Sequence, residues 1–289
     1  MPIEILAQTL VNGLFLGGIY ALVAMGLTLI YGVMIIINFA HAEFLMIGMY
    51  VSFWAFTLFG IHPYMAIILA TVILFLFGAL IQRGLIEPVL KAPLLNQILL
   101  TLGLSTLIMG LAQFFWRAEP RSILIPFASS SLRVGDLILN WPRLIAFIAS
   151  IVLTIGLYFF LKKTKTGKAI RACSQNRVAA QLTGVNVRKI YMLTFGIGAA
   201  LTGIAGVLIS PNYPMTPTIG QTFSITAFVV VVLGTMGNFV GAFIGGLIIG
   251  VAEAFGGLYL GSDVRQVVSM GIFILVLLLR PQGLFGRMI

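Results

Sequence analysis

The stretch ILAQTLVNGLFLGGIYALVAMGLTLIYGVMIIINFAHA, residues 5–42, contains no Asp, Glu, Lys or Arg. A helix needs roughly 20 mainly apolar residues to cross a lipid bilayer, so this stretch can supply one span and begin another. Further charge-free runs follow, and dividing them at polar and Pro-rich positions predicts eight or nine spans. The candidate spans are residues 6–31, 33–59, 64–82, 94–116, 143–161, 190–209, 222–237, 239–260 and 264–280.

The composition of the whole chain agrees with this pattern. Of 289 residues, 60% are hydrophobic and 8% are charged, whereas an ordinary soluble domain is about 25% charged and 45–50% apolar. A water-soluble chain could not bury so much apolar surface, because over half of an ordinary folded surface is already apolar. Soluble enzymes, nucleic-acid-binding domains and disordered proteins are therefore excluded. We expect an all-α, polytopic integral membrane protein with a single transmembrane domain over residues 1–289.

The net charge of +10 is concentrated in a few loops. With nine crossings, the loops near 83–93, 162–189 and 280–289 share one side of the membrane and carry 12 of the 17 basic residues. Eight of these lie in the loop 162–189. Loops rich in Lys and Arg stay in the cytoplasm, which is known as the positive-inside rule. Because the loop 280–289 lies on the basic side, the rule predicts a cytoplasmic C-terminus and an external N-terminus.

Polar residues inside the apolar runs are candidates for function, because a charge at the bilayer centre costs about 2.5–3.5 kcal/mol on insertion scales. Asn38, His41 and Glu43 interrupt the apolar stretch from Gly32 to Gly60. Such a cluster is tolerated where a helix is broken or faces a cavity, so we expect a broken helix within residues 33–59. On a broken turn His41 and Glu43 could pair. The three residues are predicted to line or shape a translocation pathway; alternatively, His41 and Glu43 are solvated at the membrane interface.

Glu253 is the other acidic residue inside a predicted span. It could pair with His41, hydrogen-bond to another span, or lie near the outer mouth of the bundle. The chain has one cysteine, Cys173, and two histidines, which is too few for a zinc or iron–sulfur site. Gly167-Lys168 is followed by Ala169 instead of Ser or Thr, so it is not a nucleotide-binding P-loop. No metal, cofactor or catalytic site is predicted.

The loop 162–189 contains a stretch from Ala169 to Leu182 without Pro or Gly, which predicts one amphipathic helix with Gly184 as its C-terminal cap. This helix would lie on the membrane interface or dock to a partner subunit. Elsewhere, glycines at steps of four favour close helix packing, within this chain or against another subunit. They are Gly237, Gly241 and Gly245.

Several motifs are similar to those of a known family. Val178-Ala179-Ala180 followed by Gly184 resembles the Glu-Ala-Ala-x-x-x-Gly docking loop of ABC-importer permeases, with Val178 in place of the glutamate. More specific motifs resemble the branched-chain amino acid permease family, in particular the shorter of its two permeases. They are Gly26–Gly32 with Ile37–Glu43, Thr166–Ala172, Asn176, Val231–Gly237 and Arg280–Gly286, although Ala42 stands where the family often has Gly.

The resemblance implies a permease subunit of an ABC importer for branched-chain amino acids in a prokaryotic inner membrane. It further implies a second related permease, two cytoplasmic ATPases that hydrolyse ATP, and an extracytoplasmic substrate-binding protein. The helix 169–184 would transmit the movement of the ATPases in an alternating-access cycle. The coupling residues would be Ala169, Arg171, Val178, Ala179, Ala180 and Gly184.

Other functions remain open at this point. The same importer class includes permeases for urea, short amides and other amino acids. An ion-coupled secondary transporter would need titratable relays in its spans, for which only His41, Glu43 and Glu253 are available. A membrane-embedded enzyme would need a nucleophile, base or metal cluster that the sequence does not reveal. A purely structural membrane subunit would not explain the polar residues near His41.

Overall fold

The computed structural model describes residues 2–261, 264–280 and 282–285. Pro281, Gly286 and Arg287, which belong to the predicted C-terminal motif and cytoplasmic tail, lie outside the described residues. Within the described part, six helical segments are long and apolar enough to cross a membrane. They are α1 (Ile3–Met34), the segment Pro63–Val89, α5 (Leu94–Trp116), α6 (Trp141–Lys163), α9 (Val187–Ile209) and α11 (Phe239–Leu260).

Three further apolar helices are shorter: α2 (Glu43–Phe59), α10 (Ile219–Leu233) and α12 (Arg265–Leu279). At 1.5 Å per residue they reach about 22–26 Å, less than the roughly 30 Å hydrocarbon core. Every candidate span therefore contains a helix, but these three are too short to cross a bilayer upright.

The predicted break within residues 33–59 is confirmed. α1 runs through Gly32 to Met34, residues 35–42 are not helical, and α2 begins only at Glu43. We call residues 35–42 the α1–α2 break.

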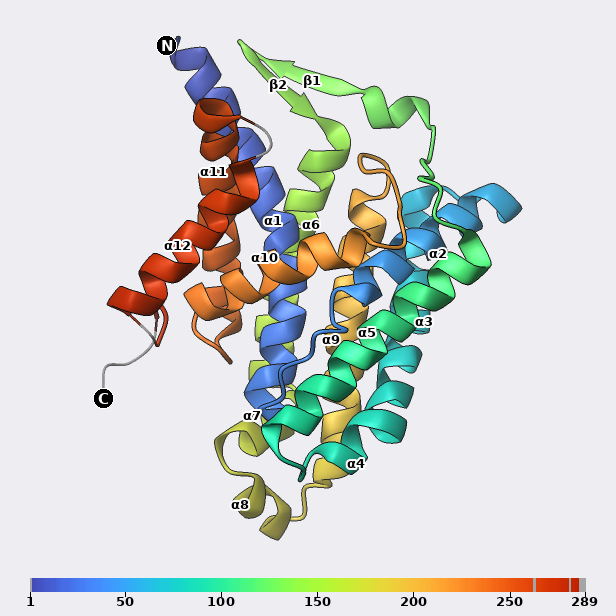
Figure 1. Cartoon of the computed structure of the whole chain (residues 1–289), viewed down its shortest axis with the longest axis vertical. Helices are drawn as coiled ribbons and strands as arrows, with labels where there is room; N and C mark the ends of the chain where they lie inside the picture. The colour runs from blue at the N-terminus through green and yellow to red at the C-terminus, as the bar shows by residue number, and fades with distance from the viewer. Residues whose placement is uncertain (1, 262–263, 281, 286–289) are drawn as a thin grey trace.

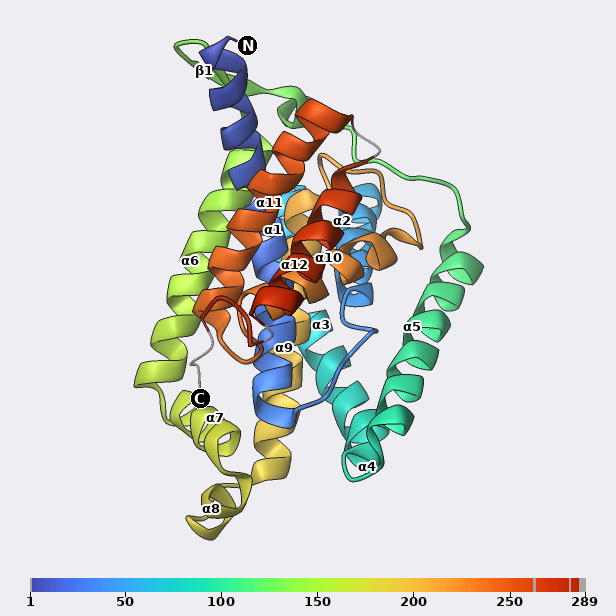
Figure 2. The same ribbon diagram turned by 60° about the vertical axis from the view of Figure 1, so that its left-hand side comes forward.

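α1 lies in the middle of the bundle, with α6, α9, α10 and α11 packed around it (Figures 1 and 2). Glycines allow its close approach to α11: a Cβ added at Gly13 would lie 2.7 Å from Val251 Cα, and one at Gly17 would lie 2.7 Å from Gly246 O. Lipid tails are as apolar as the side chains, so the hydrophobic effect does not drive helices together within a membrane. Backbones this close are held together by dispersion contacts instead.

The segment Pro63–Val89 changes its helical geometry near its end. It consists of η1 (Pro63–Met65), α3 (Ala66–Ile81), a π-helical turn η2 (Gln82–Ile86) and α4 (Glu87–Val89). In the π turn the N–H of Glu87 bonds to the carbonyl of Gln82. α3 packs along α9.

The two ends of the bundle differ in structure. Figure 1 places α4 at the same end as α7 (Lys165–Gln175) and α8 (Arg177–Leu182), so the basic loops 83–93 and 162–189 lie together. At the opposite end are the N-terminus, η3 (Pro126–Ser129) and a hairpin that the sequence reasoning missed. Its strands, β1 (Ser131–Val134) and β2 (Leu137–Asn140), are antiparallel, with Val134 opposite Leu137.

Candidate functional site

The α1–α2 break is built from local backbone geometry. Ile35 adopts a left-handed conformation, φ 55°, and donates its N–H to Tyr31 O at 2.8 Å, which ends α1. The side-chain oxygen of Asn38 accepts from Ala40 N at 3.1 Å, a local bond that favours a turn over a helix. Asn38, His41 and Glu43, which we call the polar cluster, are all at most 1% exposed.

His41 joins the break to α1 and α9. Its Nε2 lies 3.1 Å from Val23 O and 2.7 Å from Thr202 Oγ1. Because a carbonyl can only accept, the Nε2 carries the proton. His41 and Glu43, which could have paired on a broken turn, have different partners: His41 contacts Val23 and Thr202, and Glu43 bonds to Ser105.

Glu43 instead joins α2 to α5 and α10. Its Oε1 accepts from Ser105 Oγ at 2.9 Å. A Cβ added at Gly220, in the first turn of α10, would lie 2.5 Å from Glu43 Oε2. The first turns of α2 and α10 therefore meet at this carboxyl group.

The polar cluster retains unused hydrogen-bonding capacity. Asn38 Nδ2, His41 Nδ1 and Glu43 Oε2 are buried and have no hydrogen-bond partner among the described residues. About 90% or more of buried polar groups in folded proteins are bonded, so three such atoms in six residues are unusual. This arrangement suits a joint that exchanges partners when it moves.

Glu253 accepts a 2.6 Å hydrogen bond from Tyr20 Oη. Of the three arrangements considered for it, the bond to another span is the one found, and a pair with His41 is not. The bond ties α11 to α1 next to the glycine contact between these helices.

The glycines at steps of four occupy two different structures. Gly241 and Gly245 lie on α11 and face α10, where a Cβ added at Gly245 would lie 3.1 Å from Val230 O. Gly237 does not continue this stripe, because it precedes α11 and has a left-handed φ of +88°. The expectation of a helix-packing role for Gly237 is corrected accordingly: it allows a turn that passes close to Gly32.

The predicted single helix from Ala169 to Leu182 is wrong, because two helices, α7 and α8, meet at Asn176. Asn176 is extended, φ −155°, and its side-chain oxygen accepts from Ala179 N at 2.9 Å, which caps α8. Gly184, with φ +85°, ends α8: Val185 N bonds to Ala180 O and Gly184 N to Gln181 O. We call residues 165–184 the α7–α8 segment.

The α7–α8 segment exposes apolar side chains. Val178 is 66% exposed and Leu182 is 84% exposed, whereas Ala180 is 4% exposed and fixes α8 against the body. Of the other predicted coupling residues, Ala169 is partly buried and Arg171, Ala179 and Gly184 are exposed. An apolar side chain that stays exposed to water forgoes the favourable free energy of burial, so covering Val178 and Leu182 would be favourable.

Cys173 lies in the same segment but on its buried side, at 3% exposure. Burial raises the pKa of its thiol, which makes the residue less reactive. Among the described residues there is no cluster of three or more potential metal ligands.

The sequence reasoning missed the partners that hold the polar residues: Tyr20, Ser105, Thr202 and Gly220. Each is a small or polar residue inside an apolar run, which is a weak signal by itself. Their pairing with the polar cluster and Glu253 depends on which helices lie side by side.

A bundle of long apolar helices, with short helices meeting at a buried polar cluster, defines a polytopic helical membrane protein. The profile of one family, described as "Branched-chain amino acid transport system / permease component", matches residues 9–277. The chain belongs to this family, as its motifs predicted.

Individual relatives align with this chain over almost its full length. The chain is 36% identical to the high-affinity branched-chain amino acid transport system permease protein BraD of Pseudomonas aeruginosa, with 97% of this chain and 95% of the relative aligned. It is 36% identical to the corresponding protein LivH of Salmonella typhimurium, with the same coverage. The ribose import permease RbsC of Bacillus subtilis is 28% identical over 96% of this chain and 83% of the relative. No solved structure matches the chain.

Proposed function

We propose that this chain forms part of the membrane pathway of an ABC importer for branched-chain amino acids. The observation that carries the proposal is the family match over residues 9–277, together with relatives named for this transport over 97% of the chain. An apolar interior with few charges suits a substrate that has an aliphatic side chain.

The proposed assembly contains a second homologous permease, two cytoplasmic ATPases and an extracytoplasmic substrate-binding protein. The chain would be a single transmembrane domain, 1–289, in a prokaryotic inner membrane, with its N-terminus outside and its C-terminus inside. The eight basic residues of the loop 162–189 support this orientation, and the loop 83–93, which carries Arg83 and Lys91 on either side of α4, lies at the same end.

The α7–α8 segment is the proposed contact with an ATPase. Val178 and Leu182 present apolar side chains on a helix whose two ends are fixed, by Asn176 and Gly184. A capped helix anchored through Ala180 can transmit a push to α9, which follows it directly in the chain. ATP hydrolysis would take place in the partner.

The polar cluster is proposed to shape the pathway as a movable joint. Since Asn38, His41 and Glu43 are at most 1% exposed, they connect α1, α2, α5, α9 and α10 instead of facing an open channel. Their unpartnered atoms would find partners when the short helices shift between inward-open and outward-open states. Glu253 and Tyr20 would hold α11 to α1 during this movement.

The direct test is reconstitution of the complete transporter in proteoliposomes with ATP inside. We expect ATP-dependent uptake of L-leucine delivered by the binding protein, and none of ribose or urea. Uptake of ribose or urea without leucine would contradict the assigned substrate. Uptake driven by a proton or sodium gradient without ATP would contradict the ABC mechanism, as would purification of an active transporter that contains no ATPase.

A further inference from the structure

A buried glutamine continues the packing stripe of α3 into the π turn. Residues at steps of four share one face of a helix, and on α3 this face is buried against α9. The stripe consists of Ala66, Ala70, Leu74 and Gly78, and it continues into the π turn as Gln82 and Ile86. Gln82 is 0% exposed, so an amide occupies a position where the pattern provides small and apolar residues.

The amide of Gln82 has no hydrogen-bond partner among the described residues, either at Oε1 or at Nε2. Gln97, a buried glutamine near the same end of the bundle, differs: its Nε2 donates to Ala92 O at 3.0 Å. Leaving a buried amide unsatisfied costs free energy, so the protein gains nothing from Gln82 unless another molecule bonds to it.

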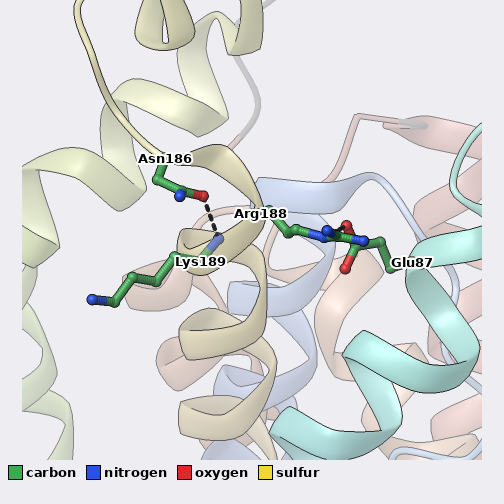
Figure 3. A network of polar contacts seen from close by, with 4 residues as sticks. All are labelled: Glu87, Asn186, Arg188 and Lys189. Atoms are coloured by element: carbon green, nitrogen blue, oxygen red, sulfur yellow. Dashed lines mark hydrogen bonds and ion pairs between the residues drawn. The ribbon is translucent and has the colours of Figure 1, made fainter.

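The π turn brings a carboxyl group to the same place. Because the N–H of Glu87 bonds to Gln82 O, Glu87 lies one turn beyond Gln82 on the same side. Glu87 Oε1 pairs with Arg188 Nε at the start of α9, and Figure 3 shows the Lys189 ammonium pointing away from this pair. Glu87 Oε2 is also buried and unpartnered among the described residues.

These groups line one cavity of about 250 Å³ between the π turn and α9. Gln82, Arg83, Glu87, Arg188 and Met192 contribute to its wall. Its wall residues therefore carry one carboxyl group, the Gln82 amide, two guanidinium groups and one thioether, and Asn186 and Lys189 complete the lining. Ligand pockets for drug-sized molecules begin near 300 Å³, so this cavity suits a smaller ligand.

We propose that this cavity binds a free α-amino acid with an aliphatic side chain from the cytoplasm. The ammonium group donates to Glu87 Oε2 and Gln82 Oε1, the carboxylate accepts from Gln82 Nε2 and Arg83, and the side chain packs on Met192. A zwitterion satisfies acceptors and donors together, which neither a simple cation nor a simple anion can do.

The cavity adjoins the docking segment. A second cavity of about 760 Å³ shares Arg83, Glu87 and Arg188 with it and extends to Arg177 and Gly184. A ligand bridging the π turn and the start of α9 restrains the α7–α8 segment, and with it the contact to the ATPase. Imported amino acid then slows the importer, which is feedback by the product; this inference rests on the proposed function.

The test uses the complete transporter in proteoliposomes with ATP inside and the binding protein outside, comparing empty vesicles with vesicles preloaded with L-leucine. We expect preloading to slow wild-type uptake several-fold. Gln82→Met should keep the wild-type rate in empty vesicles and lose the slowing. Gln97→Met, the matched control at a satisfied amide, should keep the slowing.

Analogues and melting temperature add independent readouts. Preloaded leucinamide, which lacks the carboxylate, and 4-methylpentanoate, which lacks the ammonium, should not slow uptake. Without ligand, Gln82→Met should melt at or above the wild type because it removes an unsatisfied amide, whereas Gln97→Met should melt below it.

The outcomes separate the two proposals. Normal uptake that internal leucine leaves unchanged, or equal slowing in wild type and Gln82→Met, overturns this inference alone. A lower melting temperature for Gln82→Met also overturns it, because the amide would then be satisfied within the protein. Absence of ATP-dependent leucine uptake from empty wild-type vesicles overturns the proposed function and this inference with it.

Discussion

The α1–α2 break and the α7–α8 segment each reverse the usual distribution of polar and apolar residues. The polar cluster at the break and the start of α2 buries an asparagine, a histidine and a glutamate, while the α7–α8 segment exposes Val178 and Leu182. The contacts of this cluster are made within the chain, to Val23, Ser105 and Thr202. Among the described residues the exposed side chains on α8 make no comparable contact, which is why we propose the break as an internal joint and the α7–α8 segment as an interface.

This difference predicts which changes disturb folding and which disturb coupling. Variants at the break should affect the stability of the chain and transport together. Variants on the exposed side of α8 should leave the stability unchanged and affect transport alone.

The largest effect is expected for Gly220→Ala. The new Cβ would lie 2.5 Å from Glu43 Oε2 and 3.1 Å from Ala42 O, and both belong to buried residues that cannot move aside freely. Overpacking of this kind costs about 1–3 kcal/mol. We expect a lower melting temperature and loss of most leucine uptake in proteoliposomes.

Gly103→Ala is the matched control, because a Cβ at Gly103 on α5 meets nothing within 4 Å. It should melt at or slightly above the wild type, since alanine favours a helix over glycine by about 1 kcal/mol. Equal behaviour of the two variants would show that α2 and α10 do not meet at Glu43.

The second effect is expected for Leu182→Glu. A charge at a residue that is 84% exposed does not disturb the fold, but it would have to be desolvated in an apolar contact with the ATPase. We expect an unchanged melting temperature and uptake reduced about tenfold or more, which corresponds to at least about 1.4 kcal/mol of coupling. ATP hydrolysis and uptake would be measured on the same preparation.

Gln175→Glu places the same charge in the same segment without touching Val178 or Leu182, so it should transport normally. If Leu182→Glu also transports normally, α8 is not the contact with the ATPase.

A smaller effect is expected for Thr202→Val. It removes one of the two partners of His41 Nε2 and leaves Val23 O in place. One hydrogen bond contributes about 0.5–1.5 kcal/mol, so stability and uptake should fall moderately and together. Thr106→Val is its control, because in the described part of the chain Thr106 bonds only to Leu102 O in its own exposed helix turn. A loss of uptake without any loss of stability would contradict the proposal that the break is an internal joint.

The smallest effect is expected for Arg188→Ala. Its ion pair with Glu87 connects α4 to α9, but the Arg188 side chain is 71% exposed. Exposed pairs contribute about 0–1 kcal/mol, so the melting temperature should change little, and less at high salt. A large loss of stability would contradict this expectation and would show that the ion pair between Arg188 and Glu87 stabilises the fold.

Much of the fold could be predicted from the sequence because lipid imposes a simple rule on it. Uncharged runs must form helices, which identified every apolar helix. The break was also predictable, since Asn38, His41 and Glu43 cannot lie side by side in an ordinary span without cost. The family followed from motifs spread over the chain.

Other features depend on signals that were present but local. Asn176 is a good helix N-cap, and it divides what the absence of Pro and Gly suggested was one helix. Gly135-Asp136 between Val134 and Leu137 is a typical hairpin turn, with φ +61° at Gly135.

The partners of the polar residues could not be predicted at all. Tyr20 and Glu253 are 233 residues apart, and His41 and Thr202 are 161 residues apart. Only the packing order of the helices brings these side chains together, and hydropathy does not contain that order. For the same reason, the exposure of Leu182 and the burial of Gln82 became visible only in the folded chain.

Site-specific cross-linking in the assembled transporter tests the central claim most directly. Cys173 is the chain's one cysteine, so Cys173→Ser combined with Leu182→Cys leaves a single thiol on the exposed face of α8. With a thiol-specific bifunctional reagent we expect a covalent adduct with an ATPase subunit, and none when the cysteine replaces Arg133 on β1 at the opposite end. An active transporter in which Leu182→Cys forms no adduct with an ATPase, whatever the reagent length, would contradict the account.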